Sequence, residues 1–253
     1  MAKRKRKPAP AAKRQATVSS RYPAVDIARG IAIVMMFVFH FTFDLRFYGV
    51  VNIDFIHDPF WKNFRFVIVS SFLLLVGISL HLATRNGLNI RRYNRRLLLI
   101  ISYALLVSLG SYLMFPESFI YFGILHFIAV ASVIGLWFTR FYWTNIFTGL
   151  VIVIAANLFH NEIFNHIALQ WIGFMTHLPY TEDYVPLAPW FGIVLIGIFV
   201  GKLIFNQQDE PAFLARPLHN PFARLLAFSG RHSLHIYLLH QPVFFGILYL
   251  IFG

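Results

Sequence analysis

Residues 22–49 read YPAVDIARGIAIVMMFVFHFTFDLRFYG, and this apolar stretch indicates the fold class. Up to residue 45 its apolar run is interrupted by only four ionisable side chains, Asp26, Arg29, His40 and Asp44. On an α-helix, at about 100° per residue, the four fall within a sector of about 60°. The pattern predicts a membrane helix with a polar stripe on one face. Ionisable groups inside a membrane are costly enough to indicate a functional site.

The composition sets the class of protein. The chain of 253 residues is 58% hydrophobic and 13% charged, with a mean hydropathy of +0.65. A soluble domain carries about 25% charged residues, so these values predict an integral membrane protein. The chain has no cysteine, which excludes disulfides, thiolate metal ligands and a cysteine nucleophile.

The predicted fold class is all-α: a polytopic membrane helix bundle of about seven transmembrane helices. Apolar runs long enough to cross a bilayer lie at residues 24–45, 66–84, 97–115, 118–139, 141–161, 184–201 and 232–252. An odd number of spans places the two termini on opposite sides of the membrane.

The basic residues give this topology a direction. Residues 1–21 hold eight Lys or Arg and no acidic residue, which predicts a disordered cytoplasmic tail before a membrane domain at residues 22–253. Apart from the tail, the segments on the same side carry eleven Lys or Arg against three on the other. The positive-inside rule therefore favours a cytoplasmic N-terminus. The net charge of +12 reflects topology and does not indicate nucleic-acid binding.

Five histidines are candidates for chemistry: His40, His57, His126, His235 and His240. Asp44 lies one helical turn beyond His40 and is expected to hold one of its ring nitrogens. The alternative is that each intramembrane histidine is a packed group bonded to a neighbouring helix. A metal site is not predicted, because there is no HExxH spacing and no cysteine.

Arginines form the second signal. Their guanidinium groups suit the phosphates of a soluble donor, and the candidates are Arg29, Arg91, Arg92, Arg95, Arg96 and Arg231. The alternative for the cluster at 91–96 is a topological role with contact to lipid headgroups. For Arg29 the alternative is an ion pair with Asp26 inside the first helix.

Four stretches carry a family resemblance. They are DIARG at 26–30, followed by Met35-Met36 and His40; FGILH at 122–126; DYVPLAPW at 183–190; and SLHIYLLHQP at 233–242. Together they resemble the catalytic domain of the heparan-alpha-glucosaminide N-acetyltransferase family, and most closely its small bacterial branch. The resemblance implies that residues 22–253 form a transmembrane acyltransferase-like domain in a bacterial inner membrane.

The resemblance also implies an activity. The family moves an acetyl group from cytoplasmic acetyl-CoA to an acceptor on the far side of the membrane. Its catalytic histidine lies in the first outer loop just ahead of an aromatic position, which here is His57 before Trp61. His40 stands where the animal lysosomal enzymes have Asn. Because this chain is shorter, an envelope glycan or a small amine or hydroxyl acceptor is expected in place of heparan.

These signals combine into one hypothesis. His57 acts as general base or as an acetylated nucleophile, and His40, oriented by Asp44, polarises the thioester carbonyl. The residues expected to line the substrate channel are His126, Asp183, Trp190, Tyr237 and His240. The main alternative is a transporter or export permease for a small metabolite with a His/Arg-lined pathway. A structural or regulatory membrane partner is a third reading.

Overall fold

The computed structural model describes residues 22–205, 211, 214 and 218–253, so the predicted tail at 1–21 lies outside the described residues. The regular structure of the described part is helical, as predicted. The elements in chain order are α1 Pro23–Phe47, α2 Pro59–Thr84, α3 Ile90–Met114, α4 Ile124–Phe138, α5 Trp143–Leu158, the 3-10 turn η1 Glu162–Asn165, α6 Ile167–Gln170, α7 Leu187–Ile204, α8 Pro221–Arg231 and α9 Ser233–Phe252.

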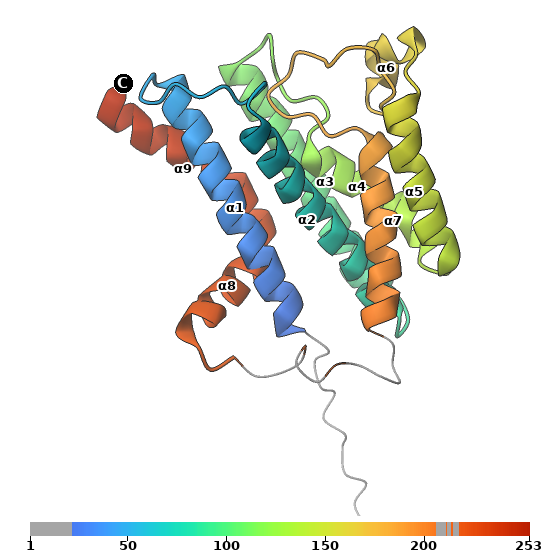
Figure 1. Cartoon of the computed structure of the whole chain (residues 1–253). Helices are drawn as coiled ribbons and strands as arrows, with labels where there is room; N and C mark the ends of the chain where they lie inside the picture. The colour runs from blue at the N-terminus through green and yellow to red at the C-terminus, as the bar shows by residue number, and fades with distance from the viewer. Residues whose placement is uncertain (1–21, 206–210, 212–213, 215–217) are drawn as a thin grey trace, which may run out of the picture.

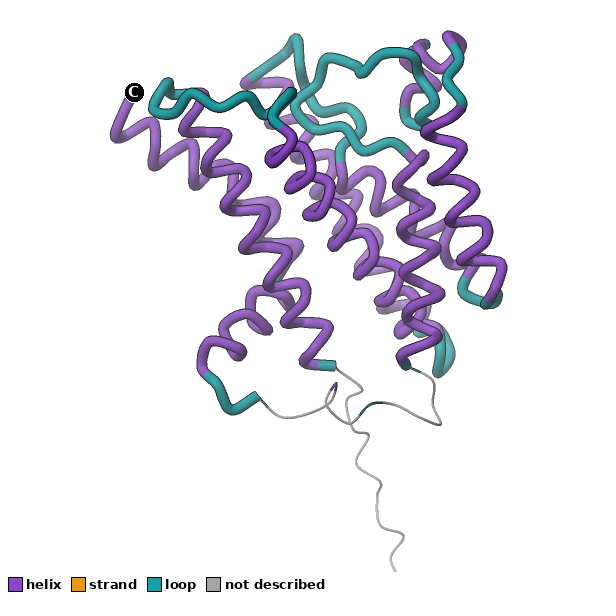
Figure 2. The backbone as a smooth tube through the Cα atoms, in the orientation of Figure 1, coloured by secondary structure: helices purple, strands orange, loops and turns teal. Residues whose placement is uncertain are grey.

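The long helices run side by side between two ends of the molecule (Figure 1). We call the end where α1 begins the proximal end and the end where α1 finishes the distal end. The connections from α1 to α2, from α3 to α4 and from α5 to α7 lie at the distal end, together with the C-terminus (Figure 2). Helix α8 lies at the proximal end, beside the start of α1.

Within the described residues, five helices are long and apolar enough to cross a membrane: α1, α2, α3, α7 and α9. The other two apolar helices are shorter, with 15 residues in α4 and 16 in α5. A full span needs about 20 residues, so the count of seven spans stays a prediction. Helix α4 begins at Ile124, later than the predicted 118, because residues 118–122 form a loop bonded to the segment before α7. In that loop Glu182 N–H donates to the carbonyl of Ser118, and Val185 N–H to that of Phe122.

The core lies where α2, α4 and α7 meet. Leu73, Phe127, Leu195 and Ile198 are fully buried there. Helices α2 and α7 approach so closely that a Cβ at Gly197 would meet the backbone oxygen of Leu74 at 2.3 Å. Close backbone contact through small residues is the usual way in which membrane helices associate. Many large apolar side chains on the outer helix faces are exposed, which fits a bilayer around the bundle.

Helix α8 was not predicted as a separate element. Its eleven residues begin at the cap Asn220, whose side chain accepts from Phe222 N–H, and end at Arg231. The helix is short and carries two arginines, so hydropathy does not detect it. It packs tightly against the start of α1, because a Cβ at Gly230 would meet the backbone oxygen of Asp26 at 1.8 Å. The final predicted span is confirmed as a helix, α9, which begins two residues after α8 ends.

Candidate active site

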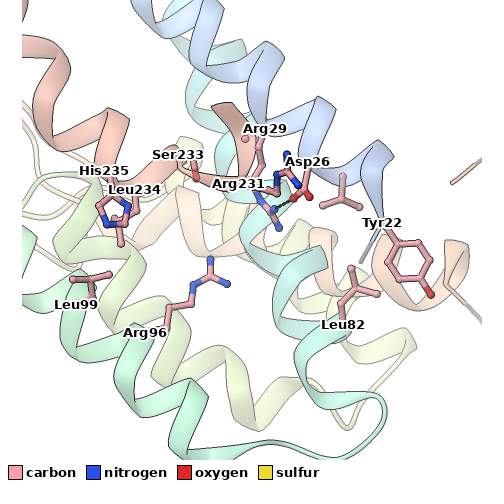
Figure 3. Close-up of a pocket in the computed structure, with 12 residues that line it drawn as sticks. Tyr22, Asp26, Arg29, Leu82, Arg96, Leu99, Arg231, Ser233, Leu234 and His235 are labelled. Atoms are coloured by element: carbon pink, nitrogen blue, oxygen red, sulfur yellow. Dashed lines mark hydrogen bonds and ion pairs between the residues drawn. The ribbon is translucent and has the colours of Figure 1, made fainter. Parts of the chain in front are cut away.

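A cavity of about 380 Å³ opens at the proximal end between α1, α2, α3, α8 and α9. Three arginines line it, Arg29 from α1, Arg96 from α3 and Arg231 from α8 (Figure 3). Leucine side chains from three helices make the apolar part of the wall, namely Leu82, Leu99 and Leu234. The sequence could not show that these arginines meet, because they lie on helices far apart in the chain.

Two side chains among the described residues hold Arg29 in place. Its Nη1 donates to Asp26 Oδ1 at 2.8 Å, and its Nη2 donates to Ser79 Oγ at 2.6 Å. The intrahelical ion pair expected from the i, i+3 spacing is therefore present. The bond to Ser79 fixes the guanidinium against α2, so Arg29 reaches the cavity as a rigid donor.

Only one member of the predicted 91–96 cluster lines this cavity. Arg96 points into it, whereas Arg91, Arg92 and Arg95 are exposed along the first turns of α3 and are not among its lining residues. The exposed three fit the alternative role at the membrane surface.

At the distal half of the bundle, two predicted histidines meet. The rings of His40 on α1 and His240 on α9 have centroids 5.0 Å apart. His240 is 5% exposed, stacks on Phe37 with centroids 6.0 Å apart, and its Nδ1 lies 2.6 Å from the carbonyl oxygen of Tyr237. A carbonyl oxygen only accepts, so Nδ1 carries the proton and Nε2 is left as an acceptor when the ring is neutral.

The predicted hydrogen bond between Asp44 and His40 is wrong. Asp44 is fully buried, and its Oδ1 accepts from Gln241 Nε2 at 3.2 Å, while its Oδ2 has no partner among the described residues. The physical reason is that α9 packs beside α1 and offers an amide donor across the helix interface. His40 is therefore positioned by the ring of His240.

Asp183 joins three elements on the distal side. Its Oδ2 accepts from Ile124 N–H at 2.9 Å, which caps α4, and from the Tyr237 hydroxyl on α9 at 3.4 Å. Burial raises the pKa of Asp183, while the hydrogen bond from Ile124 and the charge of Arg65 act in the opposite direction. The carboxyl thus ties the loop before α7 to both helices.

His126 lies close enough to Asp183 for their charges to interact. Its Nδ1 accepts from Gly123 N–H at 3.3 Å, and its Nε2 lies 3.1 Å from Ser108 Oγ. Since Nδ1 is an acceptor, the neutral ring carries its proton on Nε2 and donates to Ser108. Three predicted channel residues, His126, Asp183 and Tyr237, are therefore brought together, and Tyr237 leads on to His240, whose ring centroid lies 5.4 Å from its own.

His57 lies apart from this group, in the loop between α1 and α2. Its Nδ1 is 2.8 Å from Asp54 Oδ2, and Asp54 Oδ1 accepts from the backbone N–H of Ile56 and His57 at 2.9 Å each. Hydrogen bonds from the backbone and the ring of His57, and from Ile56, lower the pKa of Asp54 to about 2. The carboxylate is thus ionised near neutrality, so Nδ1 of His57 carries the proton and Nε2 is free to accept one.

Asp54 is the functional candidate that sequence reasoning missed. It precedes His57 by three residues, but a turn has no periodicity that would have revealed the contact. The His57 side chain is 81% exposed. Its loop is nevertheless fixed, because Phe55 is buried against Phe39 and Trp61, with ring centroids 5.3 and 4.8 Å away.

A comparison with known protein families identifies the family of this chain. The family described as heparan-alpha-glucosaminide N-acetyltransferase, catalytic, matches residues 21–242, nearly the whole chain. The chain belongs to this family. Comparisons with curated proteins and with solved structures found no match. The resemblance seen in the four sequence motifs is thereby confirmed, and the protein is a multi-pass membrane member of an acetyltransferase family.

In this N-acetyltransferase family member, the polar stripe of α1 is not continuous. Ile33 and Met36 lie on the stripe between Arg29 and His40, and they are 2% and 3% exposed. Both are packed inside the bundle, so apolar side chains separate the proximal arginines from the distal histidines.

Trp190 does not join the polar group. It lies on α7, its ring 5.4 Å from that of Phe66, at the edge of the apolar core. Among the described residues, no group of three or more His, Asp or Glu is gathered as metal ligands would be.

Proposed function

We propose that this protein is an acetyl-CoA-dependent membrane acyltransferase. It moves an acetyl group from a donor bound at the proximal, cytoplasmic end to an amine or hydroxyl acceptor at the distal end. The observation that carries the proposal is the cavity lined by Arg29, Arg96 and Arg231 in a chain of an N-acetyltransferase family.

The donor is proposed to bind by its phosphate-bearing end. Guanidinium groups bind phosphate oxygens through paired N–H donors, and three of them face one cavity of about 380 Å³. This volume suits part of a CoA molecule rather than all of it. The pantetheine arm then runs along α1, whose rise from Arg29 to His40 is about 17 Å.

The path of that arm is filled by Ile33 and Met36 in the present structure. Reaction therefore requires these side chains to yield. Met36 is suited to this because its unbranched thioether chain adopts several shapes at low cost.

The proposed chemistry places the base in the distal loop. Nε2 of His57 takes the proton from the acceptor as its nitrogen or oxygen attacks the thioester carbonyl, while Asp54 holds the Nδ1 proton and stabilises the imidazolium. His40 donates a hydrogen bond to the carbonyl oxygen as negative charge develops on it. The tetrahedral intermediate then collapses, the C–S bond breaks, and the imidazolium returns its proton to the departing thiolate. The alternative route acetylates Nε2 of His57 before the acceptor arrives.

The acceptor is proposed to be an envelope amino sugar or a similar small amine or alcohol. Asp183, Tyr237, His126 and His240 supply hydrogen-bonding groups on the distal side. Trp190 lies apart from these groups, against Phe66, and is given no part in binding the acceptor.

The test is an acetyl-transfer assay on purified protein, with acetyl-CoA labelled in the acetyl group and an envelope extract as acceptor. The wild type should transfer label, and His57→Ala should lose transfer. His177→Ala is the matched control, because His177 is also an exposed distal loop histidine. If sealed vesicles accumulate intact labelled donor without acetylating any acceptor, the protein is a transporter and the proposal is wrong. Equal transfer by His57→Ala and wild type would overturn the site assignment.

A further inference from the structure

Helix α8 presents three different faces at the proximal end. One face, with Ala227 and Gly230, is buried against the start of α1. A second carries Phe222, Leu225 and Phe228, all of them exposed. The third carries Arg224 and Arg231. An exposed apolar face beside arginines is typical of a helix that lies in the interface of a membrane.

A second cavity, of about 330 Å³, lies where this helix meets α1. Its lining residues are Pro23, Asp26, Leu218, Arg224, Ala227 and Arg231. Arg224 and Arg231 are seven residues apart, which places them on the same side of α8 and about 10 Å apart along its axis. Two extended arginine side chains at that spacing can reach a single group between them.

The described charges in this cavity do not cancel. Among the described lining residues Asp26 is the one acidic residue, and its carboxylate is already paired with Arg29 at 2.8 Å. Within the described part of the chain, neither Arg224 nor Arg231 forms an ion pair. The cavity therefore offers two guanidinium groups to an anion.

We propose that this second cavity binds the phosphate group of an anionic phospholipid, with the acyl chains against the exposed face of Phe222, Leu225 and Phe228. Phosphate chemistry alone would also fit a soluble phosphate. A lipid is favoured because the arginine face of α8 adjoins its exposed apolar face, so one amphiphile contacts both. The inference goes beyond the proposed acyl transfer and does not depend on it. Asp26 and Arg231 line both cavities, whereas Arg224 lines only the second, so Arg224 is the residue that tests the lipid site.

The experiment is native mass spectrometry of the full chain released from detergent micelles, titrated with phosphatidylglycerol, phosphatidylcholine or inorganic phosphate. We expect phosphatidylglycerol to bind at least tenfold more tightly than phosphatidylcholine. Arg224→Gln should weaken phosphatidylglycerol binding about tenfold, because it removes one of two charge-assisted contacts. Arg140→Gln is the control: it makes the same change of charge in the α4–α5 connection, outside both cavities.

Three results would overturn the proposal. If Arg224→Gln binds phosphatidylglycerol as tightly as wild type does, the second cavity is not the lipid site. An equal loss in Arg140→Gln would show a response to net charge alone. Displacement of the lipid by millimolar inorganic phosphate would identify a soluble anion as the ligand. Retention of acetyl transfer by Arg224→Gln together with weakened lipid binding would keep this site separate from the proposed catalytic one.

Discussion

The two ends of α1 carry ionisable residues in different arrangements. At the proximal end, arginines from three helices face an open cavity, and Arg29 is fixed by both Asp26 and Ser79. At the distal end, His40 and His240 are packed ring to ring among aromatic side chains. The first arrangement exposes fixed positive charge to a ligand, whereas the second packs two imidazole rings against each other and against aromatic side chains.

The polar stripe of α1 therefore forms two sites, and a donor that reaches both has to displace the side chains between them. Ile33 and Met36 separate them. Substitutions at the distal end should therefore change chemistry without changing donor binding, and substitutions at the proximal end should do the reverse.

His57→Ala should cause the largest loss. Removing a general base typically lowers a rate by about 10²–10⁴-fold, and the His57 side chain is too exposed for its removal to disturb the core. The dissociation constant for acetyl-CoA, measured by isothermal titration calorimetry, should stay within about twofold of wild type. If donor affinity and transfer rate fall together, the proximal and distal ends of α1 do not act as separate sites.

Gly230→Ala should strongly reduce stability through the proximal end. The added Cβ would lie 1.8 Å from the backbone oxygen of Asp26, so α8 must shift away from α1. Overpacking of this kind costs about 1–3 kcal/mol or more, and thermal unfolding in detergent would measure it. Gly246→Ala on α9 is the control, because no heavy atom lies within 4 Å of its added Cβ. The free energy of unfolding of Gly246→Ala should rise by up to about 1 kcal/mol from helix propensity. If Gly230→Ala and Gly246→Ala are destabilised by equal amounts, close packing of α8 against α1 is not the cause.

Arg96→Gln should weaken donor binding about tenfold, since one of three guanidinium groups is lost from the cavity. The maximal transfer rate at saturating donor should stay close to wild type. Arg92→Gln, one turn earlier on α3 and outside the cavity, is the comparison variant. The same tenfold weakening in both variants would assign the effect to the surface charge of α3, and a fall in maximal rate with unchanged affinity would place Arg96 in the chemistry.

The local features of this fold could be predicted from the sequence. The first helix, predicted at 24–45 and observed as Pro23–Phe47, follows from hydropathy, and the Asp26–Arg29 pair follows from i, i+3 spacing. Both are properties of a single segment. The helix α8 was missed because an eleven-residue amphipathic helix carries no spanning signal. The lengths of α4 and α5 were overestimated because apolar loop residues extend their hydropathy windows.

The site depends on contacts that no local pattern encodes. His40 meets His240, and Asp44 meets Gln241, across about 200 residues of chain. The sequence suggested a partner for Asp44 within α1, but the packing of α9 supplied a different one. Asp54 reaches His57 through a turn whose conformation is set by backbone bonds rather than by periodicity. Residue types were thus predictable, and their partners were not.

Asp183→Asn should give the smallest effect and the clearest pH signature. Burial raises the pKa of Asp183 in the folded protein above its usual value of 3.8. The folded state therefore binds this proton more tightly than the unfolded state, and the free energy of unfolding falls as pH rises from 3.8 through the raised pKa. An Asn cannot titrate but still accepts from Ile124 N–H, so thermal unfolding scans should show that part of the pH dependence flattened.

Tyr237→Phe is the control for this prediction. It removes the hydroxyl bonded to Asp183 and leaves the carboxyl able to titrate, so the pH dependence of its stability should match that of wild type. If Asp183→Asn follows the wild-type pH profile, the titrating group lies elsewhere. The distal end would then be linked to pH through its histidines rather than through the carboxyl that ties the loop to α4 and α9.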